Sequence, residues 1–134
     1  MRDISETKTI KIGDAEFTIG FISRRQWRKM SSRFTEPFTT IKNSRNEDGT
    51  FKVSPESMKA SEELQDVYLD MIKYSVRDHK NLKRNDGTDI SFQKDSDGNV
   101  SPLLLDTYDL NNLTAPLGME VLMFNVMTDS DQKN

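Results

Sequence analysis

The chain offers few residues for catalysis. It has one histidine, His79, and no cysteine, which excludes disulfide bonds and cysteine nucleophiles. His79 lies in a charged stretch between Arg77 and Lys80, so we expect it to be solvated. A Ser/His/Asp triad stays open because its members need not be close in sequence, but no Gly-x-Ser-x-Gly motif is present to hold the serine. We therefore expect a protein that is not an enzyme.

Metal and cofactor sites are also poorly supported. Residues 95–99 resemble part of a calcium-binding loop, but the first and twelfth positions of that loop would be Gln93 and Leu104, so we expect a turn there. Glu120 is the one carboxylate within an apolar run, and we expect it on the polar side of its helix, near Asn125. Zinc would need more His or Cys ligands, and no phosphate-binding glycine motif occurs. We expect no cofactor.

A cluster of basic side chains lies at residues 24–33. It surrounds Trp27 and contains no acidic residue; its members are Arg24, Arg25, Arg28, Lys29 and Arg33. Such a helix could bind phosphates, so a nucleic-acid-binding regulator is one hypothesis. The net charge of −3 and the lack of a second cluster of this density argue against nucleic acid as the partner. The other interpretation is a solvated face complementary to the acidic half of another copy.

Charge is distributed unevenly between the two halves of the chain. Residues 1–53 contain 11 basic and 7 acidic side chains, a net charge of +4, whereas residues 54–134 contain 8 and 15, a net charge of −7. Such asymmetry can steer a partner or orient two copies head to tail. A chance distribution over two solvated faces is an equal alternative.

An interaction surface is the best-supported kind of site, and it involves the apolar helix expected near the C-terminus. One stripe of this helix is formed at helical spacing by Met119, Leu122, Met123, Val126 and Met127. The roughly opposite face is formed by Leu117, Val121 and Phe124. Methionine stripes suit adaptable binding surfaces, but helices that are apolar all round are usually buried. The sequence leaves open which face lies in the core and which forms an interface.

The elements that must position these residues follow from periodicity and capping. Alternating polar and apolar residues around Gly13 predict a β-hairpin whose apolar face includes Phe17, Ile19 and Phe21. Ser23 and the Ser54–Pro55 pair are typical helix starts, and Pro37 is expected to end the first helix. The predicted elements are a hairpin at about 8–21, a basic helix at 23–35, a polar loop at 39–53, a central helix at 55–78, a turn-rich segment at 80–100 and C-terminal helices at 102–127.

Together these elements predict a mainly helical α+β protein, one domain of 134 residues with an N-terminal β-hairpin and a long amphipathic central helix. The N-terminus carries charges where a signal peptide needs an apolar run. No stretch approaches the roughly 18 apolar residues of a membrane span. We expect a cytoplasmic protein without a membrane partner.

This order of elements resembles the tail assembly chaperones of long-tailed bacteriophages and prophages. The resemblance is carried by residues 10–19, by the Arg24-Arg25-Gln26-Trp27 sequence and by residues 67–72, and it covers most of the chain as a pattern. The long polar loop and residues 86–99 are less typical of the family. The resemblance implies a non-catalytic protein of the host cytoplasm that coats the tape measure protein, recruits tail tube protein and self-associates. Such proteins are often also made in a longer, frameshifted form.

The candidate interaction residues combine the hairpin face, the basic helix and the final helix. They are Phe17, Ile19, Phe21, Arg25, Trp27, Arg28, Met119, Leu122, Met123, Val126 and Met127. A phage structural component such as a head–tail connector is a further alternative, because it too would work through protein contacts.

Overall fold

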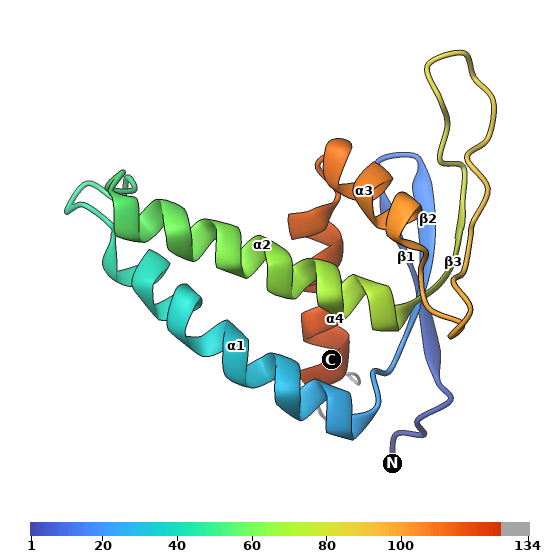
Figure 1. Ribbon diagram of the computed structural model, residues 1–134, viewed down its shortest axis with the longest axis horizontal. Helices are drawn as coiled ribbons and strands as arrows, with labels where there is room; N and C mark the ends of the chain where they lie inside the picture. Colours follow the sequence, from blue (N-terminus) through green and yellow to red (C-terminus); the bar gives the residue numbers. More distant parts are fainter. Residues whose placement is uncertain (127–134) are drawn as a thin grey trace.

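The computed structural model describes residues 1–126, in which three strands form one antiparallel sheet and four helices pack beside it. In chain order the elements are β1 (Thr7–Ile12), β2 (Ala15–Gly20), α1 (Arg24–Asn43), α2 (Pro55–Ser75), β3 (Val76–Lys80), α3 (Pro102–Leu110) and α4 (Thr114–Val126). β2 is the central strand. Helices α1 and α2 form an antiparallel pair that extends away from the sheet, and α4 crosses behind α2 (Figure 1). The predicted α+β class is confirmed.

The predicted β-hairpin is present, but its apolar face is part of the core. β1 pairs with β2 in a register that places Ile10 opposite Phe17, and Gly13 turns the chain with a φ of +61°. Phe17 and Ile19 are fully buried, and the Phe21 ring stacks on Phe124 of α4 at 4.5 Å. Burial of each such side chain contributes about 1.5–3 kcal/mol to folding. This face is covered by the protein's own helices.

The central helix ends earlier than predicted, because the chain continues into a strand. α2 ends at Ser75, and β3 adds to the sheet with Val76 opposite Ile19 and Asp78 opposite Thr18. The buried Ser75 hydroxyl donates a hydrogen bond to the Gly20 carbonyl at 2.6 Å. The prediction of a helix to residue 78 was wrong because sheet pairing, which joins segments far apart in sequence, outweighs local helical periodicity.

The first helix, by contrast, is longer than predicted. α1 continues past Pro37 to Asn43, so the predicted helix end near residue 35 and the start of the polar loop at 39 were wrong. A proline inside a helix costs roughly 3 kcal/mol through one lost hydrogen bond and a steric clash. Here Pro37 is buried, and it lines a hollow together with Val67 of α2. Packing between α1 and α2, which form one of the most extensive helix contacts in the fold, offsets that cost.

The remaining loops contain three tight turns of the same kind. Each contains a glycine with positive φ, Gly49, Gly87 or Gly98, and each is closed by a pair of bridging residues six positions apart. In the first two, the aspartate before the glycine accepts hydrogen bonds from the backbone and hydroxyl of the following threonine. At residues 95–99, backbone amides donate to the Asp95 carboxylate. The turns predicted within residues 80–100 are therefore confirmed.

Candidate protein-interaction surface

The two apolar faces of α4 have different surroundings. Leu117, Val121 and Phe124 are buried, so this face belongs to the core. On the other face, Met119 is 41% exposed, Met123 is 47% exposed and Val126 is 56% exposed, while Leu122 is partly buried. The methionine stripe therefore faces outward. The sequence had left open which face of this helix lies in the core and which is exposed. Met127, also predicted in this stripe, lies outside the described residues.

The exposed stripe of α4 continues onto the arm, the name used here for the antiparallel pair α1 and α2. The Tyr68 hydroxyl of α2 donates to the Met119 sulfur at 2.9 Å. The Tyr68 ring lies 6.0 Å from Phe34 of α1, and Phe34 stacks on Phe38 at 5.2 Å. Phe38 is 46% exposed. A row of contacts thus connects α4 with the middle of α1.

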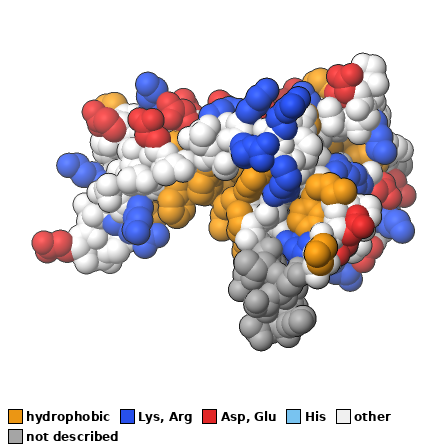
Figure 2. Space-filling view, turned by 90° about the horizontal axis from the view of Figure 1, so that it is seen from below, with side chains coloured by type: hydrophobic (Ala, Val, Ile, Leu, Met, Phe, Trp, Pro, Cys, Tyr) orange, Lys and Arg blue, Asp and Glu red, His pale blue; other side chains and the backbone are white. Residues whose placement is uncertain are grey.

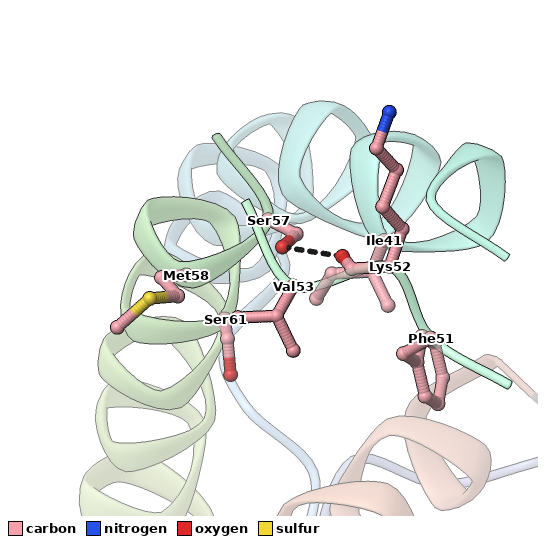
Figure 3. A pocket seen from close by; sticks show the side chains of 7 residues that line it. All are labelled: Ile41, Phe51, Lys52, Val53, Ser57, Met58 and Ser61. Atoms are coloured by element: carbon pink, nitrogen blue, oxygen red, sulfur yellow. Dashed lines mark hydrogen bonds between the residues drawn. The ribbon is translucent and has the colours of Figure 1, made fainter. Parts of the chain in front are cut away.

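The row ends in a pocket at the far end of the arm, because Phe38 lines one hollow together with Ile41, and Ile41 also lines this pocket. This pocket, of about 250 Å³, is lined mainly by the apolar side chains of Ile41, Phe51, Val53 and Met58 (Figure 3). The Ser57 hydroxyl donates to the Lys52 carbonyl at 2.9 Å and closes one side. Phe51 and Val53 lie in the segment predicted as a polar loop, and the sequence did not indicate that they join an apolar surface.

We call this continuous surface the inner face. Its principal residues are Phe34, Phe38, Ile41, Met58, Met119 and Met123. In the space-filling view, hydrophobic side chains gather in the hollow under the arm, and basic side chains lie over α1 beside them (Figure 2). The inner face is therefore concave as well as apolar.

The opposite side of the arm is polar. A second hollow there is lined by Ser32, Arg33, Glu36, Glu63 and Asp66, together with Pro37 and Val67. Arg33 also pairs with Asp70 at 2.6 Å across the two helices. Exposed ion pairs of this kind contribute at most about 1 kcal/mol each, so their main effect is to keep this side hydrated. Each arm helix thus has one apolar and one charged side.

Two members of the basic cluster are held by the protein itself. Arg24 donates to the Asn125 side-chain oxygen at 2.6 Å and to the Ile22 carbonyl at 2.7 Å. Partial burial lowers the pKa of Arg24, and the positive charges of Arg2 and Arg28 lower it further. The second is Arg33, which pairs with Asp70. The other members, Arg25, Arg28 and Lys29, are exposed, and their side chains make no such hydrogen bond or ion pair within the described residues. Trp27 is half-buried against the core.

His79 is buried, so the prediction of a solvated histidine was wrong. Its ring packs edge-on against Phe17, Phe92 and Tyr108. The Ile90 carbonyl, 2.6 Å from Nε2, can only accept, so Nε2 carries the proton and Nδ1 accepts from the Tyr108 hydroxyl at 2.6 Å. Burial raises the pKa of Tyr108, and the negative charge of Asp78 adds to that effect. Both ring nitrogens are used in structural hydrogen bonds.

Asn125 is a second polar residue that the sequence did not indicate. It was expected on a solvated stripe with Glu120, but it is buried, whereas Glu120 is half-buried. Its oxygen accepts from the Ile22 amide at 3.0 Å, and its side-chain amide donates to the Val121 carbonyl at 2.8 Å. Asn125 therefore joins the end of α4 to the chain between β2 and α1. An asparagine within an apolar run is the only sequence signal for this role.

The candidate interaction residues therefore separate into three groups. Phe17, Ile19 and Phe21 belong to the core, so their assignment to an interaction surface was wrong. Arg25 and Arg28 are exposed at the base of the arm. The exposed methionine stripe forms one end of the inner face. Phe34 was predicted within the first helix but not as part of an interaction surface, and Phe38 was missed because that helix was predicted to end near residue 35.

Within residues 1–126, no group of three or more His, Cys, Asp or Glu side chains is placed to hold a metal ion. None of the helices in that part of the chain is long and apolar enough to cross a bilayer. No family model, curated protein or solved structure matches the chain. Its function is therefore argued from the surface itself.

Proposed function

We propose that this protein is a non-catalytic tail assembly chaperone that holds an apolar helical segment of a phage tape measure protein against its inner face. The observation that carries the proposal is the continuous apolar surface from Met119 and Met123 to the pocket at the end of the arm. The sequence resemblance supplies the kind of partner. Recruitment of tail tube protein belongs to the same proposal through that resemblance.

The physical case rests on shape and side-chain chemistry. A concave apolar strip suits the apolar face of an amphipathic helix, whose side chains recur every three to four residues. Met119 and Met123 are flexible and polarisable, so they can accommodate successive segments of a long helix that differ in sequence. Phe34 and Phe38 supply large, rigid aromatic surfaces, and such surfaces contribute much of the binding energy at interfaces.

The charged outer side completes this case. A chaperone that covers an apolar helix must itself stay dissolved in the complex. The hollow that includes Arg33, Glu63 and Asp66 lies on the side of the arm away from the inner face. A bound helix would thus leave the hydrated side of the arm unchanged.

The test is co-expression with the tape measure protein of the same phage genome. We expect the wild-type chain to increase the soluble fraction of that protein, and we expect Phe38→Asp and Met123→Asp each to abolish the increase. Leu110→Asp is the matched control, because Leu110 is an exposed apolar residue of α3 outside the inner face. It should behave as wild type.

Two results would contradict the proposal. One is a tape measure protein whose solubility does not depend on the chain. The other is recovery of the chain as a component of purified phage particles, which would favour a structural role such as a connector, because an assembly chaperone should be absent from them.

A further inference from the structure

Basic side chains from two distant segments of the chain meet at the base of the arm. The Arg33–Asp70 ion pair fixes how the antiparallel helices α1 and α2 are aligned. One turn closer to the sheet, Lys29 of α1 therefore lies level with Tyr74 of α2. The Lys73 ammonium lies 5.2 Å from the centroid of the Tyr74 ring, so it belongs to the same region. Lysines of both helices thus lie close to one tyrosine.

The next turn toward the sheet adds two arginines. Arg25 precedes Lys29 by one turn of α1, and it lies level with the start of β3 (Figure 1). Strands β2 and β3 shift register next to Arg77, which is the extra residue of a β-bulge, and a bulge redirects a side chain. Arg77 donates to the carbonyl of Phe21, shortly before α1, at 2.8 Å. Its guanidinium group therefore lies beside the start of α1.

We call this surface the basic patch, and Figure 2 shows basic side chains gathered over the start of α1. Its members are Arg25, Arg28, Lys29, Lys73 and Arg77. Within residues 1–126, the members in α1 and α2 form no ion pair. No acidic residue occurs in residues 17–35, and Asp70 of α2 is already paired with Arg33. Asp78, next to Arg77 in β3, leaves the patch with an excess of positive charge.

We propose that the basic patch binds the phosphate backbone of a nucleic acid without reading its sequence. Arginine and lysine side chains make such contacts, which hold the backbone but carry no sequence information. Arg77 donates to the carbonyls of Phe21 and Tyr74, and its guanidinium group has further N–H groups for a phosphate. The inference goes beyond the proposed function and does not rest on it.

The chemistry of the patch favours a nucleic acid over an acidic protein or a membrane. Protein interfaces are more than half apolar, whereas nucleic-acid interfaces are more polar and much more positively charged, and this patch is formed almost entirely by charged side chains. The exposed large apolar side chains of the arm lie on the inner face, so the patch has none to insert into a bilayer. In the sequence, the lack of a second basic cluster argued against nucleic acid, but the fold adds Lys73 and Arg77 from a distant segment.

Fluorescence anisotropy with a labelled DNA duplex of mixed sequence tests the inference. We expect the wild-type chain to bind with a Kd of about 1–100 μM at physiological salt, which is typical of binding to the backbone alone. The logarithm of the binding constant should fall against the logarithm of salt concentration with a slope of about −4, as expected for four or five neutralised phosphates. A duplex of unrelated sequence should bind equally well.

Charge reversals locate the site. Lys29→Glu and Lys73→Glu should each weaken binding by about tenfold or more, and Lys73→Ala should reduce the salt slope by about one. Lys73 is the decisive position, because only the fold places it near Lys29. Lys59→Glu is the matched control, since it makes the same charge change in the same helix at the other end of the arm, and it should bind as wild type does. Circular dichroism and thermal unfolding of these variants should match wild type, because none of these lysines is buried.

A wild-type chain that does not bind the duplex even at low salt would overturn the inference. Equal weakening by Lys59→Glu would also overturn it, because binding would then depend on net charge and not on the patch. Tighter binding of a poly-glutamate peptide or of phosphatidylserine vesicles than of DNA would replace the nucleic acid by an acidic protein or a membrane. Lys29→Glu and Lys73→Glu should act as wild type in the co-expression assay, because the patch lies outside the inner face, so the two proposals can fail separately.

Discussion

At the scale of single residues, one buried hydrogen-bond network joins three parts of the chain. His79 of β3 bonds to Tyr108 of α3 and to the carbonyl of Ile90, so the strand, the helix and the loop between them are connected through one imidazole. Within residues 1–126, every buried side-chain nitrogen and oxygen has a hydrogen-bond partner. Loss of one partner would leave a buried polar atom unsatisfied, at a cost of about 1–3 kcal/mol.

We predict that Tyr108→Phe lowers the free energy of unfolding by about 1–3 kcal/mol at neutral pH, because Nδ1 of His79 loses its donor. Urea unfolding measures this change. Tyr74→Phe, which alters a half-buried tyrosine at the end of α2, is the control and should have little effect. Equal effects of the two variants would contradict the network.

The same tyrosine predicts a dependence on alkaline pH. Burial raises the pKa of Tyr108 above its ordinary value, so the unfolded chain loses this proton at lower pH than the folded chain. The stabilisation is complete below the unfolded pKa of about 10 and is lost as pH rises above it. The difference in stability between wild type and Tyr108→Phe should therefore shrink above about pH 10.

The burial of His79 shows why residue-level prediction from the sequence failed here. Charged neighbours indicate exposure when a segment is helical or irregular. In a strand, successive side chains point to opposite faces, so Asp78 and Lys80 are exposed while His79 between them faces the core. The histidine could be placed only after the segment was known to be β3.

At the scale of elements, the crossing of α4 over α2 fixes where the inner face begins. Gly118 lies directly against the Tyr68 side chain, and a Cβ atom built there would come within 2.6 Å of the Tyr68 ring. The glycine thus permits a close approach between the two helices. This approach also sets the position of the adjacent Met119.

We predict that Gly118→Ala destabilises the protein by roughly 1–3 kcal/mol, because overpacking outweighs the gain of about 1 kcal/mol in helix propensity. Thermal unfolding measures the change. Gly20→Ala is the control, since its added methyl group would meet only the flexible guanidinium of Arg77, at 3.0 Å, and should cost less. A Gly118→Ala variant as stable as wild type would contradict the close packing of α4 on Tyr68 of α2.

Elements with a local signal were predictable, and those that depend on distant segments were not. The hairpin around Gly13, the Ser54 capping box of α2 and the Ser101 cap of α3 are encoded within a few residues. Strand β3 forms because its backbone pairs with the free edge of β2. Helix α1 continues beyond Pro37 because α2 packs against it. Both helices of the arm were predicted in part, but the continuation of α1 past Pro37, which carries Phe38 and Ile41 of the inner face, could not be predicted from local patterns.

At the scale of the whole molecule, a compact sheet-and-helix body carries a two-helix arm with one apolar and one charged side. Neither part alone forms the inner face, which needs α4 from the body and the Phe34–Phe38 stack from the arm. The sequence indicated the methionine half of this surface but not its aromatic half. The proposed partner is a consequence of this one concave surface.

Photocrosslinking tests the central claim most directly. A photoreactive phenylalanine analogue in place of Phe38 would sit in the middle of the inner face, and the same analogue in place of Leu110, which is 83% exposed, is the control. In cells that express the tape measure protein, we predict that the substituted Phe38 crosslinks to an apolar helical segment of that protein and that the substituted Leu110 does not. Crosslinks of equal yield from both positions, or none from Phe38, would contradict the claim that the inner face is the binding surface.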